Sequence, residues 1–129
     1  PSEPIVSIEG QGRIDVQVSG IESNEGQLYV EIYDESTYFR YEDVLREQIV
    51  AVTSEAMTVT LSDVPPGRYI VAVSHDINSN SKLDTTTFGL PTEAYGFSRG
   101  ARGLTGPPDF EDGAFEFNGT GIVVPVRID

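Results

Sequence analysis

Residues 65–76 read PPGRYIVAVSHD, and this stretch decides the fold class. Pro65-Pro66-Gly67 predicts a type II turn, because proline presets φ and glycine accepts a positive φ. The run that follows, Tyr69–Val73, carries apolar residues on both of the faces that alternate along a strand. We therefore expect a central strand here, covered on both sides.

Strands with strict alternation stand on both sides of this run. Ile14–Val18, Leu28–Ile32 and Met57–Leu61 place apolar residues at every second position, and residues 122–128 do the same. Turn residues separate such segments roughly every 8–12 positions, which is typical of a β-sandwich. We predict one all-β domain over residues 1–129, a seven- or eight-stranded antiparallel β-sandwich with one long irregular loop.

Two features near the end of the chain predict local geometry. Asn118-Gly119 favours a two-residue type I′ hairpin loop that joins the last two strands. Pro125 has no N–H to donate, so we expect the last strand to be an edge strand or to carry a bulge.

Composition excludes several classes of function. The 129 residues carry a formal net charge of −13, which disfavours binding to nucleic acid and to anionic lipid surfaces. There is no cysteine, so disulfides, thiolate metal sites and cysteine nucleophiles are excluded. No apolar run is long enough to insert into a membrane, since a spanning helix needs about 20 residues.

Residues 76–112 show no sustained alternation, and they begin with a series of oxygen donors. A structureless stretch of this length is usually functional or pinned. Donors at every second residue are the spacing of a calcium loop, although this one follows a strand, unlike an EF-hand. The alternative is a metal-free loop in which Asp and Asn bond to their own backbone. The candidate calcium ligands are Asp76, Asn78, Asn80 and Asp84 through side chains, Lys82 through its carbonyl, and Glu111 and Asp112 as remote ligands.

His75 is the one histidine of the chain. Its position in the alternation of the strand places it on the core-facing side, so we expect a buried, hydrogen-bonded histidine that braces the long loop. Ser74 and Asp76 point to the opposite face and cannot form a catalytic relay with it. We therefore predict that the protein is not an enzyme.

Aromatic residues gather in the second half of the irregular stretch. Tyr95, Phe97 and Phe110 are candidate ligand-binding residues, which would stack on a glycan or contact a protein ligand. The alternative is that they point inward and form a small satellite core under the loop.

Several of these segments form an ordered series that covers nearly the whole chain. They are Gly26–Asp34, Val64–Tyr69, His75-Asp76, Leu83-Asp84, Gly89–Pro91, Glu93, Tyr95–Ser98, Gly106–Pro108, Phe110–Asp112 and Ala114-Phe115. In this series the chain resembles a family of bacterial exported proteins known as "domain of unknown function 2141". The resemblance implies a prealbumin-like or immunoglobulin-like sandwich and a signal peptide in the precursor.

Together these observations predict a non-catalytic structural or binding module. We expect it to be secreted or periplasmic, with a loop organised by calcium and with a glycan or protein as a further partner. The alternative function is a carbohydrate- or peptide-binding module that uses the aromatic residues of the 88–112 region.

Overall fold

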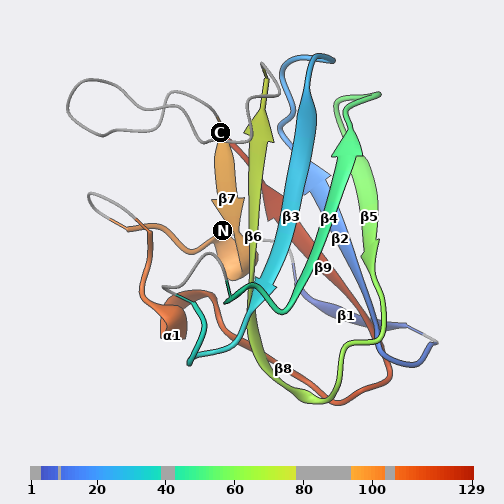
Figure 1. Ribbon diagram of the computed structural model, residues 1–129, viewed down its shortest axis with the longest axis vertical. Helices are drawn as coiled ribbons and strands as arrows, with labels where there is room; N and C mark the ends of the chain where they lie inside the picture. The colour runs from blue at the N-terminus through green and yellow to red at the C-terminus, as the bar shows by residue number, and fades with distance from the viewer. Residues whose placement is uncertain (1–3, 9, 39–42, 78–93, 104–106) are drawn as a thin grey trace.

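Short strands of alternating polarity build two β-sheets that pack face to face (Figure 1). The computed structural model describes residues 4–8, 10–38, 43–77, 94–103 and 107–129. One sheet has the strand order β1-β9-β2-β5, and the other has β4-β3-β6-β7 with β8 also paired to β6. The strands are β1 (Val6–Ile8), β2 (Arg13–Ser19), β3 (Gln27–Tyr33), β4 (Arg46–Ala51), β5 (Met57–Leu61), β6 (Gly67–Asp76), β7 (Tyr95–Phe97), β8 (Phe115–Phe117) and β9 (Gly121–Arg127), with a 3-10 turn η2 (Ser98–Gly100) and a single-turn helix α1 (Phe110–Gly113).

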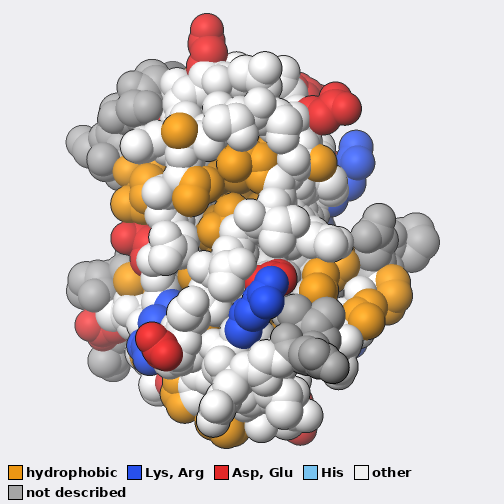
Figure 2. Space-filling model, turned by 90° about the vertical axis from the view of Figure 1, so that its right-hand side faces the viewer, with side chains coloured by type: hydrophobic (Ala, Val, Ile, Leu, Met, Phe, Trp, Pro, Cys, Tyr) orange, Lys and Arg blue, Asp and Glu red, His pale blue; other side chains and the backbone are white. Residues whose placement is uncertain are grey.

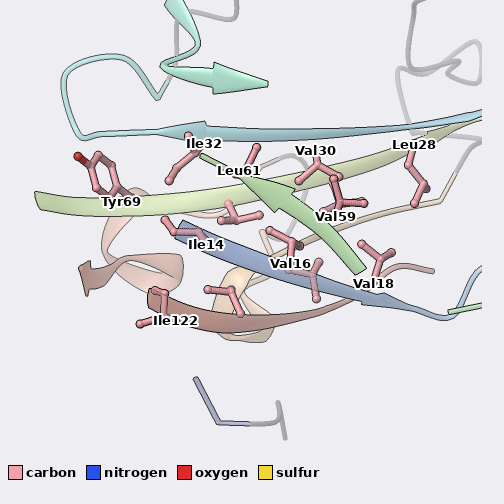
Figure 3. Packing of buried hydrophobic residues seen from close by; sticks show 14 of the residues in the cluster. Ile14, Val16, Val18, Leu28, Val30, Ile32, Val59, Leu61, Tyr69 and Ile122 are labelled. Atoms are coloured by element: carbon pink, nitrogen blue, oxygen red, sulfur yellow. The ribbon is translucent and has the colours of Figure 1, made fainter. Parts of the chain in front are cut away.

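The main core lies between the two sheets, where the alternating apolar side chains meet (Figure 3). The inward residues of β2 and β3 are each at most 1% exposed, so the predicted alternation of these strands is confirmed. The two inward rows are Ile14, Val16 and Val18 from β2, and Leu28, Val30 and Ile32 from β3.

The strand β6 is the central strand that the sequence predicts. It pairs with β3 along residues 70–76, with β7 at residues 72–74 and with β8 at residues 67–69. Val71 and Val73 point into the main core, whereas Ile70 points to the other face. There it belongs to a second apolar cluster, which consists of Tyr33, Tyr38, Ile70, Phe110 and Ala114.

Backbone hydrogen bonds connect β7 to Asp129, just beyond the end of β9. The backbone N–H of Asp129 donates to the carbonyl of Tyr95 at 3.2 Å, and the N–H of Tyr95 donates back at 3.4 Å. A Cβ atom at Gly96 would collide with the carbonyl oxygen of Arg127. This position therefore requires glycine, because backbone on the opposite sheet occupies the space of a side chain.

The prediction of a terminal hairpin at Asn118-Gly119 is wrong. The strand before this turn, β8, pairs with β6 in one sheet, whereas β9 belongs to the other sheet. Gly119 does take a positive φ of 93°, and the Asn118 side chain accepts a hydrogen bond from the N–H of Thr120. The conformation of the Asn118-Gly119 turn depends on neighbouring residues and was therefore predictable. The turn connects two strands of different sheets, however, and not two strands of one hairpin.

The strand β9 is an interior strand, although it contains Pro125. It pairs in parallel with β2 on one side and antiparallel with β1 on the other. The pairing with β1 ends at Val123, so the missing N–H of Pro125 interrupts no ladder with that strand. The β2–β9 pair departs from the purely antiparallel sandwich that we predicted.

The irregular stretch that we predicted over residues 76–112 is partly structured, since it contains β7, η2 and α1. None of the helices in the described ranges is long and apolar enough to cross a membrane.

The side on which β4 and β5 lie shows a band of hydrophobic side chains between polar ones (Figure 2). These two strands are edge strands of different sheets and lie against each other. Val50 and Met57 are partly buried and pack against the main core from this side.

Candidate functional site

The base of the segment that follows β6 is held by several backbone contacts. The N–H of His75 donates to the carbonyl of Ala94 at 2.9 Å, so the two ends of the segment between them lie side by side. A Cβ atom at Gly26 would collide with the carbonyl oxygens of Asp76 and Ile77. Gly26, with φ of 76°, thus lets the chain leave β6 close against the start of β3.

His75 is buried at this base, as the alternation of β6 predicts. Its side chain is 2% exposed, and Nε2 lies 2.7 Å from the carbonyl oxygen of Glu25. Because this carbonyl can only accept, Nε2 carries the proton in the contact. The histidine therefore ties β6 to the residues that precede β3, which confirms the expectation that it is buried and hydrogen-bonded.

Asp76 is the one predicted side-chain metal ligand of the 76–84 series that the structure describes. It is the last residue of β6, is 3% exposed and stands in register with Gln27 of β3. Asn78, Asn80, Lys82 and Asp84 lie outside the described residues. In the part of the chain that is described, there is no group of three or more His, Cys, Asp or Glu side chains that could hold a metal ion.

Glu111 and Asp112 lie on α1, at the other end of β6 from Asp76. Both guanidinium nitrogens of Arg68 bind the Glu111 carboxylate, at 2.5 and 2.7 Å, and this ion pair lowers the pKa of Glu111. From Arg68 to Asp76 the chain runs eight residues of extended strand, about 26 Å at about 3.3 Å per residue. The structure therefore does not bring Glu111 together with Asp76, and a single ion cannot contact both.

The predicted ligand-binding aromatics pack against one another on the outer face of the β6 sheet. Phe110 is 6% exposed and contacts Tyr38 edge-on, with 6.0 Å between the ring centroids. Phe97 makes edge contacts with Tyr38 and with Tyr95. Phe110 thus belongs to the second apolar cluster and Phe97 packs against it, as in the satellite core that the sequence offered as the alternative, whereas Tyr95 is half-buried beside Phe97.

Two arginines cover this aromatic cluster from outside. Arg68 lies 5.7 Å from the centroid of Phe110, and Arg102 lies 5.2 Å from the centroid of Tyr95. Arg102 also pairs with the carboxylate of Asp129. The cation–π contacts help to close the surface over the rings.

The residue that sequence reasoning missed is Ser98. It is fully buried, and it follows β7 at the point where that strand leaves β6. Its hydroxyl accepts the N–H of Val71 at 3.0 Å and donates to the carbonyl of Gly113 at 2.6 Å. One side chain thus replaces the backbone partner that β6 loses, and it ties α1 to the sheet.

Three of the segments that carry the family resemblance, Tyr95–Ser98, Phe110–Asp112 and Ala114-Phe115, contain or adjoin the residues that meet at this serine. A Cβ atom at Gly113 would come within 2.5 Å of Cδ1 and 2.8 Å of Cγ1 of Ile70, so any side chain at the last position of α1 would force the buried Ile70 side chain to move. Arg99 adds a hydrogen bond to the carbonyl of Ala114 at 3.0 Å. The sequence signal available was a serine directly after the aromatic segment Tyr95–Phe97, but its role can be assigned only once the docking of α1 is known.

Comparison with known proteins assigns a family and nothing more specific. A family model described as "Uncharacterized protein conserved in bacteria (DUF2141)" matches residues 16–124. No curated protein and no solved structure matches the chain significantly. The match covers most of the sandwich, including β6, Ser98 and α1. The chain therefore belongs to the DUF2141 family of uncharacterized bacterial proteins.

Proposed function

We propose that this protein is a non-catalytic β-sandwich module whose segment after β6 is organised by one calcium ion. The ligands are the side-chain oxygens of Asp76, Asn78, Asn80 and Asp84 and the carbonyl of Lys82. The observation that carries the proposal is the run of donors at every second residue, which starts at the buried carboxyl of Asp76.

The pinned base of the segment supports this proposal. The contact between His75 and Ala94 fixes the two ends of the intervening chain next to each other. Because the ends are already held together, an ion that binds there does not have to offset the entropy lost when a long loop is closed. More of its binding free energy is therefore available for ordering the ligands.

The chemistry of the donors suits calcium better than a transition metal. All five are oxygens, and the two carboxylates offset the charge of the ion while the amides add none. Calcium takes six to eight oxygens, so water completes the shell in this proposal. Glu111 and Asp112 are left out of the ligand set because α1 lies at the far end of β6.

Weak affinity is the expected consequence of so few charges, with a Kd on the order of 10⁻⁴–10⁻³ M. Such a site fills only where calcium is millimolar. We therefore also propose that the module works outside the cytoplasm, in a secreted or periplasmic protein. Fractionation of cells that express the natural full-length protein tests this part of the proposal.

The burial and the hydrogen bond of His75 support the proposal that the module is not catalytic. Its ring is 2% exposed and its Nε2 is engaged by the carbonyl of Glu25, so it is poorly placed to exchange protons with a substrate. The two functional groups next to it in sequence, Ser74 and Asp76, lie on the other face of β6.

Thermal unfolding with and without calcium tests the proposed site. With 5 mM CaCl₂ and a Kd of about 0.5 mM, the native state gains about 1.4 kcal/mol, which raises Tm by roughly 5 °C in a domain of this size. Asp84→Asn should abolish most of this rise, and excess chelator should reverse it in the wild-type protein.

Two controls make the result specific to the segment. MgCl₂ at equal ionic strength should have a much smaller effect, because magnesium demands a rigid octahedral shell. Glu116→Gln removes one exposed charge on β8, which pairs with β6 at residues 67–69 and not at the end near Asp76, and should leave the calcium response unchanged. A wild-type Tm that does not respond to calcium would refute the metal site.

A further inference from the structure

Two glutamates stand directly opposite each other on the β3–β4 pair. Glu31 of β3 and Glu47 of β4 are register partners in this antiparallel ladder, so both side chains project from the same face of the sheet. Glu31 is half-buried, whereas Glu47 is exposed. Like charges in directly opposed positions destabilise a strand pair, so the pair calls for an explanation.

Directly opposed residues of an antiparallel pair hold their Cβ atoms about 4.5–5.5 Å apart, so the carboxyl groups of Glu31 and Glu47 can reach each other and form a hydrogen bond. An ionised carboxylate has no proton to donate, so this bond requires one of the two groups to be protonated. The hydroxyl of Tyr33 donates to Oε2 of Glu31 at 3.1 Å, which occupies one oxygen of the same carboxyl. The cross-strand register therefore favours one proton shared between two carboxyl groups.

Within the described ranges, the groups that act on Glu31 include no positive charge that would replace this proton. Glu47 faces it from β4, Tyr33 lies beside it on β3, and β6 presents Ala72 in register. Burial, followed by the hydrogen bond and charge of Glu47, raises the pKa of Glu31 to about 7, and Tyr33 opposes the rise only in part. Among the described residues, no cation contributes to this balance.

The pair occupies the one ladder that holds β4. In the described part of the fold, β4 is the edge of its sheet and pairs with β3 alone. Its central residues are largely exposed, with Ile49 at 44%. A repulsion between the two glutamates therefore acts on the single strand pair that holds β4 in its sheet.

We propose that Glu31 and Glu47 form a proton-operated clasp, which holds the edge strand β4 on β3 in mildly acidic conditions and loosens it as the shared proton is lost at neutral to alkaline pH. The clasp works in the opposite direction to ordinary acid unfolding, in which protonation removes favourable contacts of carboxylates.

Hydrogen exchange of the β4 amides at pH 5.5 and pH 8.5 tests the clasp, after correction for the intrinsic pH dependence of exchange. Loss of the proton should lower protection of β4 by about tenfold, less than the full pKa shift implies because the pair is partly solvated. Amides of β2 in the other sheet should change far less.

Glu47→Gln is the decisive variant, because this side chain is exposed and its loss should not prevent folding. The glutamine amide donates to Glu31 at every pH, so protection of β4 should become nearly independent of pH. Glu116→Gln, an exposed glutamate on β8, is the matched control and should keep the wild-type response.

A carboxyl titration by NMR separates the clasp from a general effect of net charge. We expect one carboxyl of the pair to titrate near pH 7 in the wild-type protein, and this midpoint to disappear in Glu47→Gln. Equal β4 protection at both pH values, or an equal loss in wild type and Glu47→Gln, would overturn the proposal.

Discussion

Ser98 shows how much of this fold depends on a single buried hydroxyl. It satisfies a backbone N–H of β6 and a carbonyl of α1, and these two groups come from segments that are distant in sequence. Neither group has access to water at this position, since Ser98 is fully buried. The residue is therefore a structural bridge between β6 and α1.

Ser98→Ala should destabilise the protein clearly. It leaves the N–H of Val71 and the carbonyl of Gly113 buried without their partner, which costs about 2–4 kcal/mol in total. Urea unfolding of both proteins measures this difference. Ser7→Ala, at an exposed position of β1, should change stability by less than about 0.5 kcal/mol. A similar small effect for both variants would show that the bridge contributes little.

Among the elements, α1 depends most on contacts made by others. It has four residues, far too few to be stable alone. It is held by Ser98, by the packing of Phe110 and by the segment before it, where the hydroxyl of Tyr38 donates to the carbonyl of Pro108 at 2.6 Å. The outer face of the β6 sheet is therefore covered by α1 and neighbouring aromatic side chains, which are held in place by contacts with residues outside the helix.

Tyr38→Phe should loosen α1 selectively. The change keeps the ring in the aromatic cluster and removes the bond to Pro108, at a cost of about 1–2 kcal/mol. We expect faster hydrogen exchange in residues 110–117, with little change in β2. Tyr69→Phe is the matched variant, because its hydroxyl donates to the carbonyl of Pro65 at the same distance. It should leave α1 unaffected, and equal loosening of α1 by both variants would contradict this account.

At the scale of the whole molecule, charge opposes the compact state. The net charge is −13, and three of the described arginines, Arg13, Arg68 and Arg102, are already paired with carboxylates. As pH falls, protonation of carboxyl groups reduces the remaining repulsion. This gain in stability ends where carboxylates that form ion pairs in the folded state also become protonated.

Stability should therefore be highest near pH 5. The pKa of Asp15 is lowered, mainly by its hydrogen bonds to Arg13, so its contribution is present above its unfolded pKa and is lost as pH falls through the folded value. The pKa of Glu31 is raised to about 7, so stability falls as pH rises from about 4.5 towards 7.

Urea unfolding from pH 3 to pH 9 measures this profile. Glu31→Gln should flatten the fall on the alkaline side and leave the acid side unchanged. A maximum above pH 7 in the wild-type protein would contradict these two assignments.

The sequence predicts local features of this protein much better than long-range ones. Alternation identified β2, β3 and β5, and a run that is apolar on both faces identified β6 as central, because both signals depend on neighbours in the chain. The parallel β2–β9 pair and the docking of α1 on β6 depend on residues that are far apart in sequence. No local pattern encodes them, and the predicted terminal hairpin was wrong for this reason.

In the candidate site, too, the features that depend on neighbouring residues were predictable, and the contacts between distant residues were not. The burial of His75 followed from the alternation of β6, and its partner at Glu25 did not. The pairing of Glu111 with Arg68 was also not visible in the sequence, because no local pattern shows that α1 lies at the other end of β6 from Asp76. The Glu31–Glu47 pair needs the register of β3 and β4, which alternation leaves open.

The most direct test of the calcium proposal is a crystal structure from crystals grown in 5 mM CaCl₂, with anomalous data collected at long wavelength. We predict an anomalous peak beyond the end of β6, coordinated by six to eight oxygens that include the carboxylates of Asp76 and Asp84. A well-ordered 76–84 segment that is closed by its own backbone hydrogen bonds, with no peak among its oxygens, would contradict it.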